Sequence, residues 1–141
     1  MAGGIVHALR EAAAAAEGRR VRVVNDQHGA PTSARLVAEA LWALVRGGAS
    51  GVRHVVAAGA TTWFEVARVV YAAAGADTGL VEPCATDKSG RAAPRPRYSV
   101  LDAAATVREV GRPLPGWEDH VRAYVQTGAL PGLGLIGGAD R

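Results

Sequence analysis

The sequence has only one cysteine, Cys84, and aromatic residues make up 5% of its 141 positions. One thiol cannot close an intramolecular disulfide, and without clustered histidines it cannot form a structural zinc site. No apolar run is long enough to span a bilayer, and the chain does not open with a basic segment followed by a long apolar one. The sequence therefore predicts no membrane helix and no secretory signal, and we expect a cytoplasmic location.

Positive charge is present but not clustered. The net charge is +3, yet Lys88 is the only lysine and the arginines are spread among 13 acidic residues. A groove that binds nucleic acid normally gathers its positive charges and interleaves them with aromatic side chains. The composition therefore argues against nucleic acid as a partner, and the length suits one globular domain.

Hydrophobic periodicity and turn residues predict a small α/β domain with too few strands for a doubly wound sheet. Thr32 or Ser33 is expected to cap the second helix, and Thr61 or Thr62 the third. Four aromatic residues are expected to pack in the core, namely Trp63, Tyr71, Trp117 and Tyr124. In chain order the predicted elements are a helix over 5–16, a strand over 21–24, a helix with an apolar stripe of Val37, Ala40, Leu41, Leu44 and Val45, a strand over 51–57, a helix over 63–74, a short strand near 80–81, a Pro-rich loop over 83–96, a short helix from 102, a final helix from 117 and a Gly-rich tail.

Three catalytic patterns are incomplete. Gly132, Gly134 and Gly137 match the spacing of a dinucleotide-binding turn, but only four residues follow Gly137, too few for the helix that must receive the pyrophosphate. The tyrosine and lysine pair of a short-chain reductase is missing, because Cys84 stands four residues before Lys88. Ser99, His120 and Asp102 could be combined as a triad, but no turn exposes the serine as a nucleophile. No catalytic residue and no metal ligand is therefore predicted.

Two segments are candidates for binding. The loop 25–32 lies between a predicted strand and a predicted helix, where α/β folds place ligand loops, although a plain connection with a capped helix has the same composition. Arg91, Arg95 and Arg97 alternate with prolines in a stiff segment that could hold a diphosphate through a guanidinium, or could form a solvated basic loop.

These segments, read in order, resemble the dTDP-4-dehydrorhamnose reductases of the extended short-chain dehydrogenase superfamily. The resemblance covers about Gly4 to Gln126. It is carried by Val23-Val24-Asn25-Asp26-Gln27-His28-Gly29-Ala30-Pro31-Thr32, His54-Val55-Val56-Ala57 leading to Thr61-Thr62-Trp63, Arg95-Pro96 with Ser99 and Leu101, and Leu114-Pro115 with Trp117.

The resemblance implies a role in dTDP-rhamnose biosynthesis. In such oxidoreductases an N-terminal Rossmann domain binds NADPH and carries the catalytic Tyr and Lys, and hydride reduces the 4-keto group of a dTDP-sugar. This chain resembles only the C-terminal sugar-nucleotide-binding domain, over residues 1–127, followed by a flexible tail over 128–141. The implied substrate-binding residues are Gln27, Gly29, Pro31, Thr32 and Arg95.

We therefore expect the substrate-binding half of such a reductase, truncated or split from its cofactor half and inactive alone. The expected partners are a dTDP-sugar and a separate Rossmann-domain chain, with no cofactor bound to this chain itself. Two alternatives remain: a non-catalytic binding or regulatory module of the same fold, and a remnant without function.

Overall fold

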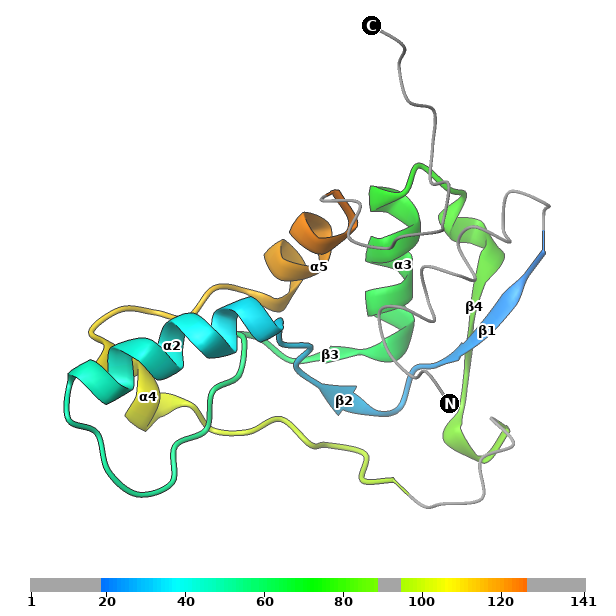
Figure 1. Cartoon of the computed structure of the whole chain (residues 1–141). Helices are drawn as coiled ribbons and strands as arrows, with labels where there is room; N and C mark the ends of the chain where they lie inside the picture. Colours follow the sequence, from blue (N-terminus) through cyan, green and yellow to red (C-terminus); the bar gives the residue numbers. More distant parts are fainter. Residues whose placement is uncertain (1–18, 89–94, 127–141) are drawn as a thin grey trace, which may run out of the picture.

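The computed structural model describes residues 19–88 and 95–126 (Figure 1). Over these ranges the chain forms two small sheets, four α-helices and two short 3-10 helices. The predicted α/β class, with strands too few for a Rossmann sheet, is confirmed for this part of the chain. The predicted helix over 5–16 and the tail over 128–141 lie outside the described residues.

Each sheet has two strands. Strand β1 (Val21–Val24) pairs in parallel with β4 (Val81–Cys84), and these match the predicted strands at 21–24 and near 80–81. Strand β2 (His28–Gly29) pairs antiparallel with β3 (Thr61–Thr62). The second sheet was not predicted, since two-residue strands carry no measurable periodicity.

The predicted helix over 63–74 is α3 (Trp63–Ala73), and its start is fixed by a capping box. The Thr62 hydroxyl accepts a hydrogen bond from the Glu65 amide, while the Glu65 carboxylate accepts one from the Thr62 amide. Both groups satisfy amides that the helix itself leaves unpaired. The 3-10 helix η1 (Thr78–Leu80) then leads into β4.

The remaining helices also follow the predictions. Helix α2 (Ala34–Arg46) is capped by Ser33, one of the two expected caps. Helix α4 (Ala104–Val110) begins just after Asp102, and α5 (Trp117–Gln126) ends the described chain. The 3-10 helix η2 (Thr86–Lys88) lies within the segment predicted as a loop.

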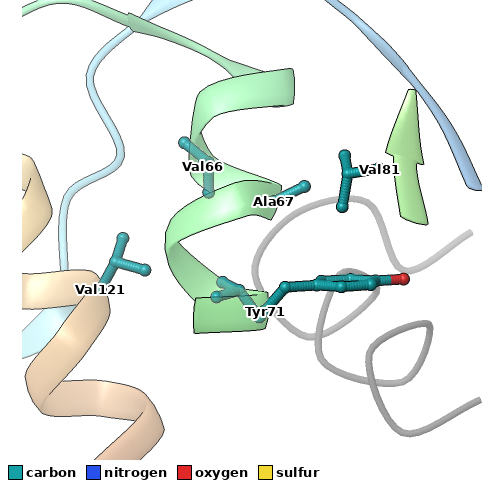
Figure 2. Packing of buried hydrophobic residues seen from close by; sticks show 6 residues of the cluster. Val66, Ala67, Tyr71, Val81 and Val121 are labelled. Carbon is teal, nitrogen blue, oxygen red and sulfur yellow. The ribbon is translucent and has the colours of Figure 1, made fainter. Parts of the chain in front are cut away.

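The larger core surrounds α3. Figure 2 shows Val121 of α5 on one side of this helix and Val81 of β4 on the other, so α3 lies between α5 and the parallel sheet. Tyr71 and Val70 are fully buried between them. The predicted core position of Tyr71 is therefore confirmed.

A second, smaller core joins α2 to α4 through Leu36, Ala40, Ala57 and Leu114. Trp117, the first residue of α5, packs against both cores. The two cores therefore meet at the start of α5.

The apolar stripe predicted for α2 is only partly buried. Ala40 and Leu44 are buried as expected, but Leu41 and Val45 are 55% and 62% exposed. Leu36, outside the predicted stripe, is 1% exposed instead. A stripe drawn from spacing alone cannot tell which edge of a broad apolar face meets the neighbouring helix.

The predicted strand over 51–57 is not formed, because no described strand lies beside it to share a ladder. Side chains hold this segment instead. The Thr106 hydroxyl donates to the His54 carbonyl at 2.7 Å, and the Ala57 amide donates to Thr32 Oγ1 at 3.0 Å. Val52, expected inside a strand, is 84% exposed.

The burial difference along α2 gives a stability prediction. We expect Leu36→Ala to lower the free energy of unfolding by about 2 to 5 kcal/mol, because it opens a cavity in the smaller core. Leu41→Ala, the same change at an exposed position of the same helix, should stay within about 0.5 kcal/mol of the native chain. Urea denaturation followed by circular dichroism measures both, and equal losses would contradict the assignment of the buried face.

Candidate functional site

A pocket of about 470 Å³ opens where the two cores meet. All five residues predicted to bind substrate line it: Gln27, Gly29, Pro31, Thr32 and Arg95. The loop that holds four of these five residues also contributes His28 and Ala30. The rest of the lining comes from β3 and the segment before it, from the start of α3, and from the segment after Arg95. These residues are Val55, Val56, Thr61, Thr62, Trp63, Val66, Pro96, Ser99 and Leu101.

Strand β2 brings these segments together, because both of its edges are used. On one edge it pairs with Thr61–Thr62 of β3. On the other edge the His28 amide donates to the Arg97 carbonyl at 2.7 Å, and the Ser99 amide donates to the His28 carbonyl at 2.9 Å. The two segments singled out in the sequence, 25–32 and 95–99, are thus joined by backbone hydrogen bonds.

Gln27 is buried at the base of the pocket, with 5% of its surface exposed. Its side-chain amide donates to the Thr86 hydroxyl at 2.9 Å. That hydroxyl donates in turn to the Asp26 carboxylate at 2.6 Å, and the Thr86 amide donates to the same carboxylate. A polar network therefore ties the binding loop to η2.

The hydrogen bonds from the Thr86 side chain and backbone hold the pKa of Asp26 below its ordinary value, and the positive charge of Arg97 adds to this effect. The folded state thus favours the carboxylate form of Asp26. This residue was quoted in the sequence motif but was not predicted as a site residue, because its partner lies 60 positions away.

Thr32 forms part of the wall rather than offering a free hydroxyl. It donates to the Ala30 carbonyl at 3.0 Å and accepts from the Ala57 amide at 3.0 Å. Between Ala30 and Thr32, Pro31 has a restricted backbone, so this turn is held in one conformation.

Arg95 supplies positive charge at the pocket. It is exposed, and among the described residues its guanidinium makes no ion pair and no side-chain hydrogen bond. The positive charge of Arg97 acts on the Asp26 carboxylate, and Arg91 lies outside the described residues. Of the three clustered arginines, Arg95 is therefore the one seen beside the pocket.

Trp63 differs from its prediction. It was expected in the core, but it is 39% exposed and lines the pocket with Val55 and Leu101. Trp63 is the first residue of α3 and lies before the part of the helix whose apolar face is buried, which explains the difference. The cap at Thr62 was the only signal in the sequence that could have placed it at this edge.

The serine, histidine and aspartate combination that the sequence argued against is not assembled. Ser99 Oγ donates to the His28 carbonyl, whereas Asp102 accepts from the Ala104 amide at the start of α4. The His120 ring lies beside Ser33 instead, with Nδ1 3.2 Å from Ser33 Oγ. These three side chains therefore do not cooperate as a nucleophilic site.

The starts of α2 and α3, the two helices beside the pocket, do not fit a dinucleotide cofactor. Pyrophosphate sites use free amides in a Gly-rich turn at a helix start, but Ser33 already caps α2, and Thr62 with Glu65 caps α3. The Glu65 carboxylate would also repel phosphate at the start of α3. Across residues 19–88 and 95–126, no three His, Cys, Asp or Glu side chains gather as metal ligands would.

The chain matches the family model described as the RmlD substrate binding domain over residues 4–129. It belongs to this family. The match confirms the resemblance to dTDP-4-dehydrorhamnose reductases, and it assigns the chain to their substrate-binding portion.

Related reductases give the same result. The chain is 45% identical over 98 residues to a dTDP-4-keto-6-deoxy-D-glucose reductase of Streptomyces niveus, covering 69% of this chain and 34% of the relative. It is 38% identical over 106 residues to the dTDP-4-dehydrorhamnose reductase of Mycolicibacterium smegmatis, covering 74% and 32%. The chain thus spans about a third of the length of these relatives.

The fold also matches solved structures. The dTDP-4-dehydrorhamnose reductase of Bacillus anthracis, solved in complex with NADP, superposes with a TM-score of 0.76 at 27% identity, covering 90% of this chain and 44% of that one. The reductase of Clostridium acetobutylicum matches in fold with a TM-score of 0.77 at 23% identity, covering 92% of this chain and 45% of that one. Within the described ranges, no helix is both long and apolar enough to cross a membrane.

The Asp26 network gives a pH prediction. Because the folded pKa is depressed, the stabilisation is complete at neutral pH and is lost as the pH falls below the ordinary pKa of an aspartate and through the lower folded pKa. We expect Asp26→Asn to lower the melting temperature at pH 7 and the difference from the native chain to shrink as the pH falls.

Asp87→Asn is the matched control, because Asp87 is an exposed carboxylate near the same loop. Thermal melts of the three chains between pH 3 and pH 7 test the prediction. A difference for Asp26→Asn that stays constant with pH would contradict the charged role of the carboxylate.

Proposed function

We propose that this pocket binds a dTDP-linked 4-keto-6-deoxysugar, and that the chain acts as the substrate-binding portion of an NADPH-dependent dTDP-4-dehydrorhamnose reductase. Gln27, Gly29, Pro31, Thr32 and Arg95 are the substrate-binding residues of this proposal. The observation that carries it is the position of Arg95, a guanidinium with no carboxylate partner among the described residues, beside the loop 27–32.

The diphosphate is the part of the ligand that Arg95 recognises. A guanidinium donates two parallel hydrogen bonds to phosphate oxygens, and it keeps its charge at every physiological pH. Among the described residues, no carboxylate forms an ion pair that would compete with a phosphate for Arg95.

The other lining groups suit the two ends of the ligand. Val55, Trp63 and Leu101 offer apolar surface for a flat nucleobase, whereas Gln27 offers a polar side chain for a sugar. The volume of about 470 Å³ lies within the range of small-molecule sites.

The names of the relatives support the chemical class of the sugar. Those of Streptomyces niveus and Mycolicibacterium smegmatis are both named as reductases of dTDP-linked keto sugars, but for different sugars. The shared part is the dTDP group and the 4-keto carbon. Reduction would require a Rossmann domain that binds NADPH and carries the catalytic Tyr and Lys. That domain would lie either on a separate chain or elsewhere in a longer protein.

We expect the chain to bind dTDP, and Arg95→Ala to weaken this binding by about 1.5 to 3 kcal/mol, because a charge-assisted diphosphate contact is lost. Arg46→Ala, which removes an exposed arginine at the end of α2, is the control for net charge and should bind as the native chain does. Isothermal titration calorimetry with dTDP measures all three.

Two results would count against the proposal. If Arg95→Ala binds dTDP as well as the native chain, Arg95 belongs to a solvated basic surface. If the native chain binds no dTDP but does bind another protein, the non-catalytic module of the same fold is the better assignment.

A further inference from the structure

The first turn of α5 contacts both walls of the pocket, but none of its residues lines the pocket. One wall is the loop 27–33 that leads into α2, and the other is the segment 55–62 that leads into α3. Two side chains of α5, Trp117 and His120, reach these walls separately. Neither is among the residues that line the pocket.

Trp117 holds the second wall. Its amide donates to the Ala58 carbonyl at 3.0 Å, and the Ala58 amide donates to the Pro115 carbonyl at 2.9 Å. The indole lies so close to Gly59 that a Cβ there would be 3.1 Å from Trp117 Cδ1. Gly59 also has a φ of 88°, so this position needs a glycine on both counts.

His120 holds the first wall through Ser33. Ser33 Oγ accepts a hydrogen bond from the Leu36 amide at 3.2 Å as the cap of α2. The same oxygen lies 3.2 Å from His120 Nδ1, and the two groups form a hydrogen bond in which either one can be the donor.

Nε2 of His120 is buried and has no hydrogen-bond partner among the described residues. A buried ring nitrogen without a hydrogen-bond partner is unfavourable in either tautomer, and an apolar side chain would fill the same space without that cost. Packing alone therefore does not account for a histidine at this position. The contact that Nδ1 makes with Ser33 does account for it.

The link from Ser33 to the pocket is short. Ser33 follows Thr32 directly, and the Thr32 hydroxyl joins the Ala30 carbonyl to the Ala57 amide across the two walls. A shift of Ser33 would therefore move Thr32 and change the distance between the walls.

We propose that the first turn of α5 is a positioning element for the pocket, in which His120 holds Ser33 and the loop 27–33 while Trp117 holds Ala58 and Gly59. His120 is a positioning residue for ligand binding and does not touch the ligand. This inference rests on the proposed function for its ligand, but the fixed geometry of the loop can be measured without one.

The test compares four variants of the whole chain. His120→Leu removes the polar contact, and His120→Asn keeps a polar atom at the position of Nδ1, since both atoms are bonded to Cγ. Ser33→Ala removes the other partner. Val121→Ala is the matched control, because it weakens the larger core from the next residue of α5 and leaves Ser33 and His120 in place.

We expect His120→Leu to weaken dTDP binding about three- to tenfold and His120→Asn to restore most of it. Ser33→Ala should weaken binding to a similar extent, and the double variant Ser33→Ala, His120→Leu should be no weaker than the weaker single variant. Val121→Ala should lower the melting temperature without changing affinity at a temperature where every variant is folded.

Amide hydrogen exchange without ligand is the second measurement. Exchange over residues 27–36 should be faster in His120→Leu than in the native chain or in Val121→Ala. If His120→Leu matches the native chain in both affinity and exchange, the inference is overturned while the proposed function stands. If the native chain binds no dTDP, the proposed function fails, and unchanged exchange in His120→Leu would overturn the positioning role as well.

Discussion

The backbone pairing of His28–Gly29 on both of its edges is the constraint on which the site depends. Strand β3 occupies one edge and the segment 97–99 the other, so three stretches far apart in the sequence meet at two residues. Backbone hydrogen bonds fix register more strictly than side-chain contacts do. Arg95 is therefore held beside the binding loop even though no described side chain pairs with its charge.

The two cores explain why a pocket forms at this place. One is built around α3 and the other between α2 and α4, and Trp117 packs against both. Val66 of the larger core and Val55, which packs against the smaller core, both line the pocket together with the loop 27–32. Such a junction suits a ligand with one apolar end and one charged end, as a sugar nucleotide has.

Caps and periodicity in the sequence predicted the long elements, and the motifs marked five residues that line one pocket, whose role in substrate binding stays a prediction. It did not predict β2 and β3, whose two residues each have no period to detect, and it assigned 51–57 to a strand that has no partner. Trp63 was misplaced because a helical stripe does not reveal where the first residue of a helix points. The pairs Asp26 with Thr86 and Ser33 with His120 are 60 and 87 positions apart, and only the folded chain brings them together.

The central claim is that the loop 27–32 and Arg95 form one site for a sugar nucleotide. An NMR titration of the 15N-labelled chain with dTDP tests it most directly. The account predicts saturable shifts in the amides of His28, Gly29, Thr61, Thr62 and Ser99 and in the Arg95 side chain, with little change at the far end of α3. No saturable shifts, or shifts gathered on the exposed face of α2 around Leu41 and Val45, would contradict it.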